Sequence, residues 1–124
     1  MFKAIVSDFD GTLACADKTV SKENLKAIEE LFSAGKKFAL CTGRMTTSAL
    51  MLAEKLPFKP LIATYNGGEI VDSSTGEILS RHVLEPNIML ELIEYGRAKG
   101  LYYQIFTDEV IVEKITNVTE FYCS

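Results

Sequence analysis

The sequence predicts an α/β protein: a Rossmann-like parallel sheet followed by the start of an α+β region. Over residues 4–64, short apolar runs alternate with stretches of helical periodicity, which is typical of parallel strands joined by crossover helices. After residue 68 the pattern changes to a hairpin, a helix and two further strands. We therefore place a domain boundary near residues 81–84, which gives two domains, 1–82 and 83–124.

The first half contains three predicted strands and two predicted helices in alternation. Ser21 is a suitable amino-terminal cap for the first helix, and Gly35 ends it. Pro57 ends the second helix because proline lacks the backbone N–H that a helix interior requires. The first strand is entirely apolar and is therefore expected to be buried. We expect strands at 4–6, 37–42 and 60–64, and helices at about 22–34 and 45–56.

The second half begins with a hairpin whose loop has four residues. Pro86 opens a third helix and Gly100 ends it, in keeping with the positions that proline and glycine favour. A turn at 107–109 separates two further strands. The strands are expected at 69–72, 77–80, 101–106 and 110–113. The apolar residues of the helix are expected to form a packing surface; they include Ile88, Leu90, Leu92 and Ile93.

Composition limits the classes of function. The chain has 124 residues, of which 48% are hydrophobic and 24% charged, as in a globular domain rather than a disordered one. A net charge of −4 gives no electrostatic reason to expect nucleic acid as a partner. No apolar run approaches the ~18 residues of a membrane span, and the amino terminus lacks the apolar core of a signal peptide. We expect a cytoplasmic protein without a membrane partner.

The cysteines and the histidine give no sign of a catalytic or metal site. Cys15, Cys41 and Cys123 are an odd number at wide spacing, which indicates reduced thiols rather than disulfides or a zinc site. Cys41 lies in an apolar run and is expected in the core. His82 and Arg44 have no partner evident in the sequence, so solvated or structural roles are expected for both.

Two aspartates follow the first predicted strand. Asp8 and Asp10 share a face if the chain stays extended, and Gly11 then allows it to turn. Their carboxylates would lie beyond the carboxyl end of the strand, where open α/β sheets bind ligands. Two close carboxylates repel each other unless a cation lies between them, and Mg²⁺ is the hard cation that prefers such oxygens. The alternative is a polar turn, in which Asp and Gly are ordinary residues.

The next two strands also end in residues suited to bind an anion. The hydroxyl of Thr42, with the Gly43 and Arg44 amides at the start of the second helix, is placed to hold a phosphate oxygen. The alternative for Thr42 is a helix cap. Asn66 and Gly67 follow the third strand at the same edge, and their alternative is a plain turn.

The motif from Ile5 to Leu13 resembles the first motif of the haloacid dehalogenase superfamily of phosphatases and phosphomutases: a hydrophobic strand, then Asp-x-Asp-Gly-Thr-Leu. Cys41 to Arg44 resembles the second motif, where a Ser or Thr binds the transferring phosphoryl group. The Asn66-Gly67 pair resembles the Cof-like sugar-phosphate branch, where Asn-Gly leads from the third strand into the cap.

The resemblance implies a Mg²⁺-dependent phosphatase of small phosphorylated metabolites that works through an aspartyl-phosphate. Asp8 would attack phosphorus, and Asp10 would protonate the leaving oxygen and later deprotonate water. The metal would be held by Asp8 and by the backbone carbonyl of Asp10. Thr42, Gly43, Arg44, Asn66 and Gly67 would bind the phosphate.

The sequence also departs from the family pattern. The family completes its site with a basic residue, usually Lys, and further carboxylates from strands that follow the cap. Lys99 and Lys114 lie in the cap-like half, and no later Asp-Asp precedes Ser124. We therefore expect an incomplete core and a partial cap, weakly active or inactive as this chain. A homo-oligomer or a missing carboxyl-terminal half is expected to cover Ile5, Leu40 and Ile62, which would otherwise lie near water.

Three other functions compete with a phosphatase. A phosphomutase of the same superfamily would use the same two aspartates. A non-catalytic module would only bind Mg²⁺ or phosphate, or assemble with another chain. A phosphoacceptor domain of the response-regulator type also places Asp and Thr at strand ends. That type needs its aspartates on different strands and an uninterrupted five-strand pattern, which this sequence lacks.

Overall fold

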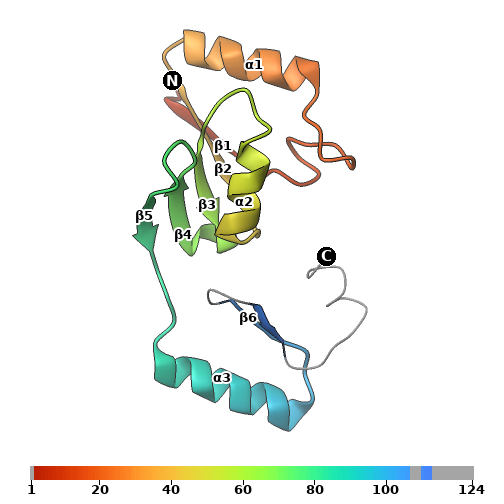
Figure 1. Ribbon diagram of the computed structural model, residues 1–124, viewed down its shortest axis with the longest axis vertical. Helices are drawn as coiled ribbons and strands as arrows, with labels where there is room; N and C mark the ends of the chain where they lie inside the picture. Colours follow the sequence, from red (N-terminus) through yellow and green to blue (C-terminus); the bar gives the residue numbers. More distant parts are fainter. Residues whose placement is uncertain (1, 107–109, 113–124) are drawn as a thin grey trace. The chain divides into compact units, whose positions relative to one another are not determined.

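A five-stranded mixed sheet organises the amino-terminal part of the chain (Figure 1). Three strands are parallel to their neighbours, and a hairpin then continues the sheet in antiparallel fashion. The strand order is the order in the sequence: β1 (Ala4–Ser7), β2 (Lys37–Cys41), β3 (Leu61–Thr64), β4 (Glu69–Asp72) and β5 (Ile78–Arg81). The α/β fold with sequential strand pairing is thus as predicted.

The computed structural model describes residues 2–106 and 110–112. The chain divides into two compact units, Met1–His82 and Val83–Ser124. Each unit is described by itself below. Among the described residues, no helix has both the length and the apolar character needed to cross a lipid bilayer.

Two helices connect the parallel strands. Helix α1 (Lys22–Ser33) begins at the predicted cap, where the Ser21 hydroxyl accepts a hydrogen bond from the Asn24 amide at 3.1 Å. Gly35 follows it in the left-handed conformation, with φ of 68°. Helix α2 (Thr46–Ala53) and a single turn of 3₁₀ helix, η1 (Tyr65–Gly67), complete the unit.

Helix α2 is shorter than predicted at both ends. The start was predicted within one residue, at about residue 45, but the Gly43 and Arg44 amides were expected at the helix terminus and instead precede the Met45 cap position. The helix starts at Thr46, and its last turn tightens so that the Lys55 amide donates to the carbonyl three residues earlier. Pro57 restricts Leu56, the residue before it, and so accounts for a helix that ends before residue 56 but not for the end at Ala53.

The core lies on one face of the sheet. Leu40, Ile62 and Val71 are aligned across three strands, and each is at most 1% exposed. Ile28 of α1 packs with the α2 side chain of Leu52 in the same cluster of buried residues. The expectation that Leu40 and Ile62 would lie near water was wrong, because both helices cover this face.

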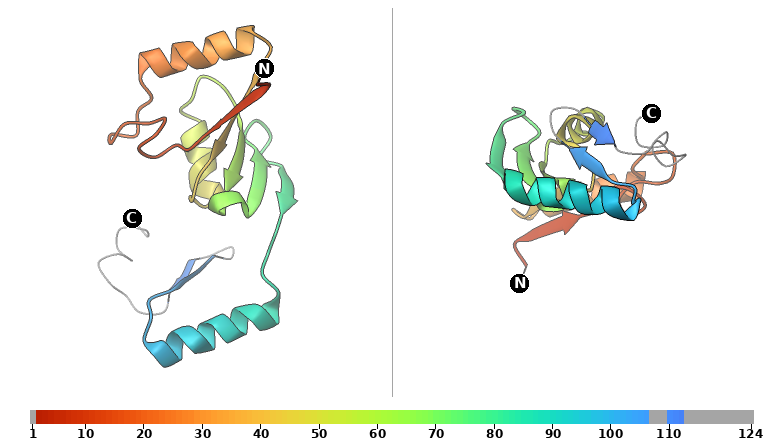
Figure 2. Two further views of the ribbon diagram at one scale, coloured as in Figure 1. Left: turned by 180° about the vertical axis from the view of Figure 1, so that it is seen from behind. Right: turned by 90° about the horizontal axis from the view of Figure 1, so that it is seen from below.

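The opposite face of the sheet is largely exposed. Val6, Leu61 and Ile70 point to this face and are 64%, 43% and 38% exposed. In the view from behind, the strands lie in front of α2, and neither α1 nor α2 crosses them (Figure 2). Cys41 shares this face and is half-buried, not a core residue as predicted.

Strand β1 forms one edge of the sheet. It pairs only with β2 among the described strands, and Ile5 is 41% exposed. The prediction of a buried first strand was therefore wrong for the described chain. An apolar strand is buried only where neighbours cover it, and β1 has a neighbouring strand on one side.

The second unit contains helix α3 (Pro86–Lys99) and the antiparallel pair β6 (Gln104–Phe106) and β7 (Val110–Val112). Pro86 is the first helical residue and Gly100 the left-handed cap, as predicted. The predicted turn at 107–109 and residue 113 lie outside the described residues. The predicted packing surface was largely wrong, because Ile88, Leu90 and Leu92 are about half exposed.

Candidate active site

Phe9 fixes the turn that carries the two aspartates. Its side chain is 1% exposed and belongs to the core, while the polar residues on either side of it stay at the surface. The Phe9 carbonyl accepts a hydrogen bond from the Ala14 amide at 2.9 Å. Gly11 has φ of 75°, a conformation that glycine adopts without steric cost. One buried ring and one glycine thus position the carboxylates beyond β1.

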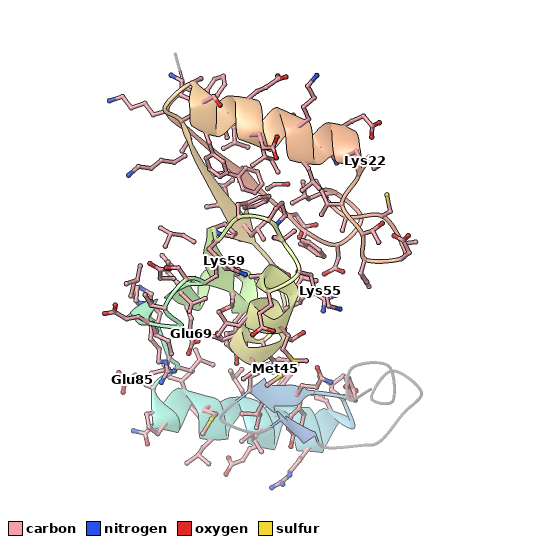
Figure 3. All side chains as sticks on the ribbon, turned by 45° about the horizontal axis from the view of Figure 1, so that its top comes forward. Lys22, Met45, Lys55, Lys59, Glu69 and Glu85 are labelled. Carbon is pink, nitrogen blue, oxygen red and sulfur yellow. The ribbon has the colours of Figure 1, made fainter. Side chains whose placement is uncertain are left out.

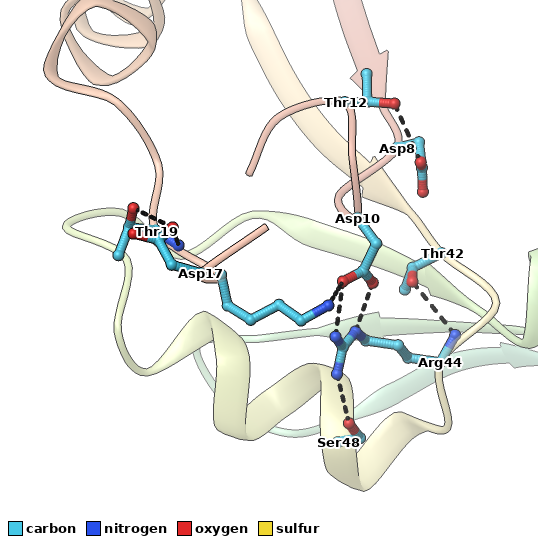
Figure 4. Close-up of polar contacts among 9 residues, drawn as sticks. Asp8, Asp10, Thr12, Asp17, Thr19, Thr42, Arg44 and Ser48 are labelled. Carbon is cyan, nitrogen blue, oxygen red and sulfur yellow. Dashed lines mark hydrogen bonds and ion pairs between the residues drawn. The ribbon is translucent and has the colours of Figure 1, made fainter. Parts of the chain in front are cut away.

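Asp8 presents an exposed carboxylate directly after β1 (Figure 4). Its Oδ2 accepts a hydrogen bond from the Thr12 hydroxyl at 3.1 Å. Thr12 belongs to the turn, so the bond joins the two ends of the Asp8–Thr12 loop. The exposure leaves the Asp8 carboxylate accessible to an incoming electrophile.

Asp10 forms ion pairs with two cationic side chains. The Arg44 guanidinium binds it in bidentate fashion, with Nε to Oδ2 and Nη2 to Oδ1 both at 2.7 Å. Lys18 Nζ lies 2.8 Å from Oδ1. The hydrogen bonds from Arg44, with a smaller contribution from Lys18, hold the pKa of the Asp10 carboxyl well below its usual range, against the opposing effect of burial. In this arrangement Asp10 is an anion.

Two partners hold the guanidinium of Arg44 in place. Its Nη1 donates to the Ser48 hydroxyl in α2 at 3.1 Å, in addition to the Asp10 pair. The carboxylate in turn raises the pKa of the guanidinium. Arg44 therefore has a structural partner in this conformation, as expected for a residue with a structural role.

Thr42 is buried immediately beyond β2. It is 4% exposed, and its amide donates to the Ala63 carbonyl of β3 at 2.9 Å. Its hydroxyl accepts a hydrogen bond from the Arg44 amide at 3.2 Å. Because α2 begins four residues later, Thr42 closes a turn before the helix and does not cap it. The Arg44 amide is engaged with this hydroxyl.

Asn66 lies against the same segment. Its backbone N–H donates to the Thr42 carbonyl at 2.9 Å, and the backbone N–H of Tyr65 donates to the Arg44 carbonyl at 3.0 Å. A Cβ placed on Gly43 would lie 3.3 Å from Asn66 Oδ1, so the two residues are in close contact. Gly67 follows in an exposed position with φ of 101°.

The structure thus brings Asp10, Thr42, Gly43, Arg44 and Asn66 together at the carboxyl ends of neighbouring strands. His82 does not join them. It follows β5, is exposed, and lies 3.4 Å from the Ser80 hydroxyl.

Sequence reasoning missed three residues of this cluster: Thr12, Lys18 and Ser48. A threonine next to a glycine turn was a weak local signal for the first. Lys18 and Ser48 gave no signal, because they reach their partners through the folded loop and the helix. Lys18 lies in the loop between β1 and α1 and contacts Asp10 from there.

The donor set fits Mg²⁺ with one carboxylate. Mg²⁺ binds through one or two carboxylates, together with water and substrate phosphate. Asp8 supplies an exposed carboxylate, whereas both oxygens of Asp10 are occupied by Arg44 and Lys18. Within the described residues, no three His, Cys, Asp or Glu side chains gather at one point. Any share of Asp10 in this conformation would come from its backbone carbonyl.

Comparison with known proteins gives consistent matches. The family model of haloacid dehalogenase-like hydrolases matches residues 5–122. The 5-amino-6-(5-phospho-D-ribitylamino)uracil phosphatase YwtE of Bacillus subtilis is 34% identical over 107 residues, which are 86% of this chain and 36% of the relative. A second phosphatase of the same name, YcsE of Bacillus subtilis, is 40% identical over 72 residues, or 58% of this chain and 29% of the relative.

A solved structure has the same fold. A haloacid dehalogenase-like hydrolase from B. subtilis superposes with a TM-score of 0.81 at 23% identity, over 95% of this chain and 41% of that one. The matched part of this chain therefore spans 29–41% of the length of these relatives. Since the family model covers nearly all of the described residues, this chain belongs to the haloacid dehalogenase-like hydrolases, with the Cof-like members as its neighbours.

Proposed function

We propose that this chain carries the phosphoryl-accepting part of a phosphatase that acts on small phosphorylated metabolites. The observation that carries the proposal is the arrangement at the carboxyl ends of β1 and β2. There, an exposed Asp8 carboxylate lies two residues from the Asp10–Arg44 pair, and Thr42 and Asn66 flank that pair. Open α/β sheets bind ligands at this edge.

Asp8 is the nucleophile in this proposal. One carboxylate oxygen attacks phosphorus, the bond from phosphorus to the ester oxygen breaks, and the phosphoryl group is carried by Asp8. Water then attacks the same phosphorus, and the bond to Asp8 breaks to release inorganic phosphate. A covalent intermediate divides one difficult hydrolysis into two easier displacements. The exposed position of Asp8 supports this role.

Asp10 moves the proton in both steps. It gives a proton to the leaving ester oxygen and later takes one from the attacking water. Its bidentate bond with Arg44 favours the anion, so Asp10 must exchange part of this contact before it carries a proton. A substrate phosphate is a competing partner for the Arg44 guanidinium, since phosphate also accepts two hydrogen bonds from it.

The remaining residues orient the phosphoryl group. In this proposal Thr42, Gly43, Arg44, Asn66 and Gly67 bind the phosphoryl group, and the contacts among Thr42, Arg44 and Asn66 that hold this segment in place support the assignment. Mg²⁺, held by Asp8 and the Asp10 backbone carbonyl, would neutralise charge between carboxylate and phosphate. The fit of Asp8 to one magnesium ligand position supports this assignment.

The substrate class is proposed from the two relatives. Both are named as phosphatases of 5-amino-6-(5-phospho-D-ribitylamino)uracil, a phosphorylated small molecule. The names support a phosphate monoester of a small metabolite as the substrate of the protein that contains this chain.

Replacement of Asp8 tests the nucleophile. We expect slow, Mg²⁺-dependent hydrolysis of p-nitrophenyl phosphate, which Asp8→Asn reduces to the uncatalysed rate because the amide cannot attack phosphorus. Asp17→Asn is the matched control, since Asp17 bonds only within its own turn to Thr19. Turnover that survives in Asp8→Asn and depends on the protein would contradict the proposal.

A further inference from the structure

A chain of polar side chains links α2 to the antiparallel hairpin. The Glu69 carboxylate, at the start of β4, accepts a hydrogen bond from the Thr46 hydroxyl at 2.5 Å. Its other oxygen lies 2.6 Å from Arg81 Nε. The Thr64 hydroxyl is 2.8 Å from that of Thr46. An ionised carboxylate only accepts, so Thr46 donates to Glu69 and Thr64 donates to Thr46.

Two of these groups, Glu69 and Thr64, are shielded from water, whereas the Arg81 side chain is 51% exposed. The Glu69 side chain is 12% exposed and Thr64 is fully buried. Hydrogen bonds to a charged acceptor in such surroundings are stronger than those between neutral groups. Connected hydrogen bonds also polarise and reinforce one another. The network is therefore a firm attachment between β3, β4, β5 and α2.

Thr46 is the attachment point on the helix. It is the first residue of α2, and Met45 before it provides no side-chain cap. Figure 3 labels Met45 ahead of this helix and Glu69 on β4. Without a cap, the first turn of α2 is fixed chiefly by what its own side chains contact, and Thr46 contacts the hairpin.

The position of this turn reaches the site through two connections. Residues 42–45 are joined directly to Thr46, so the position of Thr46 limits the positions that residues 42–45 can adopt. The Arg44 guanidinium also rests on Ser48, in the first turn of α2, while it binds Asp10. A shift of α2 would therefore move both the Arg44 backbone and the hydroxyl that orients its side chain.

We infer that Thr46 and Glu69 are positioning residues for the Arg44 guanidinium and residues 42–44. They touch neither Asp8 nor Asp10 in any described contact and act through α2. The part of the inference that concerns phosphate rests on the proposed function. The part that concerns the Arg44–Asp10 pair stands on its own.

The test compares two substitutions of the same threonine. Thr46→Val keeps the shape and removes the hydroxyl, whereas Thr46→Ser keeps the hydroxyl. Thr47→Val is a matched control at the next, exposed position of the helix. Nuclear magnetic resonance of the Arg44 Nε–Hε group reports the ion pair directly, with Asp10→Ala as the reference without it.

We expect Thr46→Val to move the Arg44 signal toward that of Asp10→Ala, and Thr46→Ser and Thr47→Val to keep it near the wild-type position. The affinity of residues 42–44 for inorganic phosphate, read from amide shifts, should fall roughly fivefold in Thr46→Val, as expected for a weakened hydrogen bond. The affinity in Thr46→Ser should stay within about twofold of the wild type, since the hydroxyl remains.

An Arg44 signal in Thr46→Val that matches Thr46→Ser would overturn the inference, even if thermal stability falls, because the network would then be only structural. Absence of phosphate binding in the wild type would count against the proposed function, and the Arg44 signal would still decide the inference. If Thr46→Val does not fold, Glu69→Gln gives the same readout with a smaller expected shift, and an unchanged signal there would overturn it.

Discussion

The two units differ in how they treat apolar side chains. Among residues 2–106, every buried apolar side chain lies in the unit Met1–His82, where α1 and α2 cover one face of the sheet. Within residues 83–106, the buried position is a glycine, Gly96, and α3 exposes Ile88, Leu92 and Tyr95. The first unit thus has a core of its own, whereas the second depends on local features of α3.

This difference explains where the candidate site lies. A site needs side chains held in fixed positions, and buried elements hold them best. Phe9 and Thr64, which adjoin the site residues in the chain or through hydrogen bonds, and the site residue Thr42 are all buried in the first unit. Helix α3 begins and ends at residues that favour helix termini, Pro86 and Gly100, but Gly96 is its one buried residue. Three substitutions test this contrast, from the largest expected effect to the smallest.

Leu40→Ala should have the largest effect. Leu40 is 1% exposed in the core, so its loss leaves a cavity and should lower the free energy of unfolding by about 3 kcal/mol. The same substitution at Leu92, which is 55% exposed, should cost less than about 1 kcal/mol. Denaturant unfolding of both variants measures the difference. Equal losses would show that the second unit has a core comparable to the first.

Gly96→Ala should loosen the second unit. A Cβ at Gly96 would lie 2.7 Å from Cδ1 of the Tyr103 ring, so the ring must move. Overpacking costs roughly 1–3 kcal/mol and the gain in helix propensity returns about 1 kcal/mol, so a net loss near 1 kcal/mol is expected. Amide hydrogen exchange along α3 should become faster.

Ala98→Gly is the control for this substitution. Ala98 is exposed in the same helix, so its change measures propensity without any steric conflict. Slower exchange in Gly96→Ala than in the wild type would show that the contact with Tyr103 does not restrict the helix.

Arg44→Gln should have the smallest effect on stability, and the effect should depend on pH. Because Arg44 lowers the pKa of Asp10, folding is favoured at pH values above the unfolded pKa of about 4, and this contribution is lost as pH falls toward the folded value. Asp10 is about a third exposed, so we expect a difference of about 0.5 kcal/mol at neutral pH that shrinks below about pH 4.

Unfolding of Arg44→Gln and wild type at several pH values measures this dependence. Lys18→Met is the control, because Lys18 is more exposed than Arg44 and contacts one oxygen of the same carboxylate. Its effect should be smaller at every pH. A stability difference for Arg44→Gln that stays constant from neutral pH to pH 3 would contradict the assigned ion pair.

Local signals in the sequence were enough to predict most elements. Ser21 and Gly35 delimit α1, and Pro86 and Gly100 delimit α3, because caps and breakers act on the residues next to them. The hairpin of β4 and β5 was predicted within one residue at each end. The start of α2 was predicted within one residue, although Met45 carries none of the usual capping groups that mark such a boundary.

The candidate site was predictable only in part. Asp10 and Thr42 follow neighbouring strands whose order in the sheet is their order in the sequence, so it followed from the strand pattern that they lie at the same edge. The strand pattern did not predict which of these side chains form ion pairs with which cations. Arg44 was expected to bind phosphate or to have a structural role, and its bidentate bond to Asp10, which spans 34 positions of sequence, was not predicted.

By itself, the sequence determined the element order, the sheet of sequential strands and the edge at which polar residues gather. These three features depend on sequence patterns a few residues long, which act through neighbouring residues and need no contact with distant parts of the chain. Only the tertiary structure decided which face of the sheet is buried, which leaves Leu40 covered and Val6 exposed. It also decided the links from Asp10 to Arg44 and from Thr46 to Glu69, because contacts between distant residues depend on how strands, loops and helices meet in space.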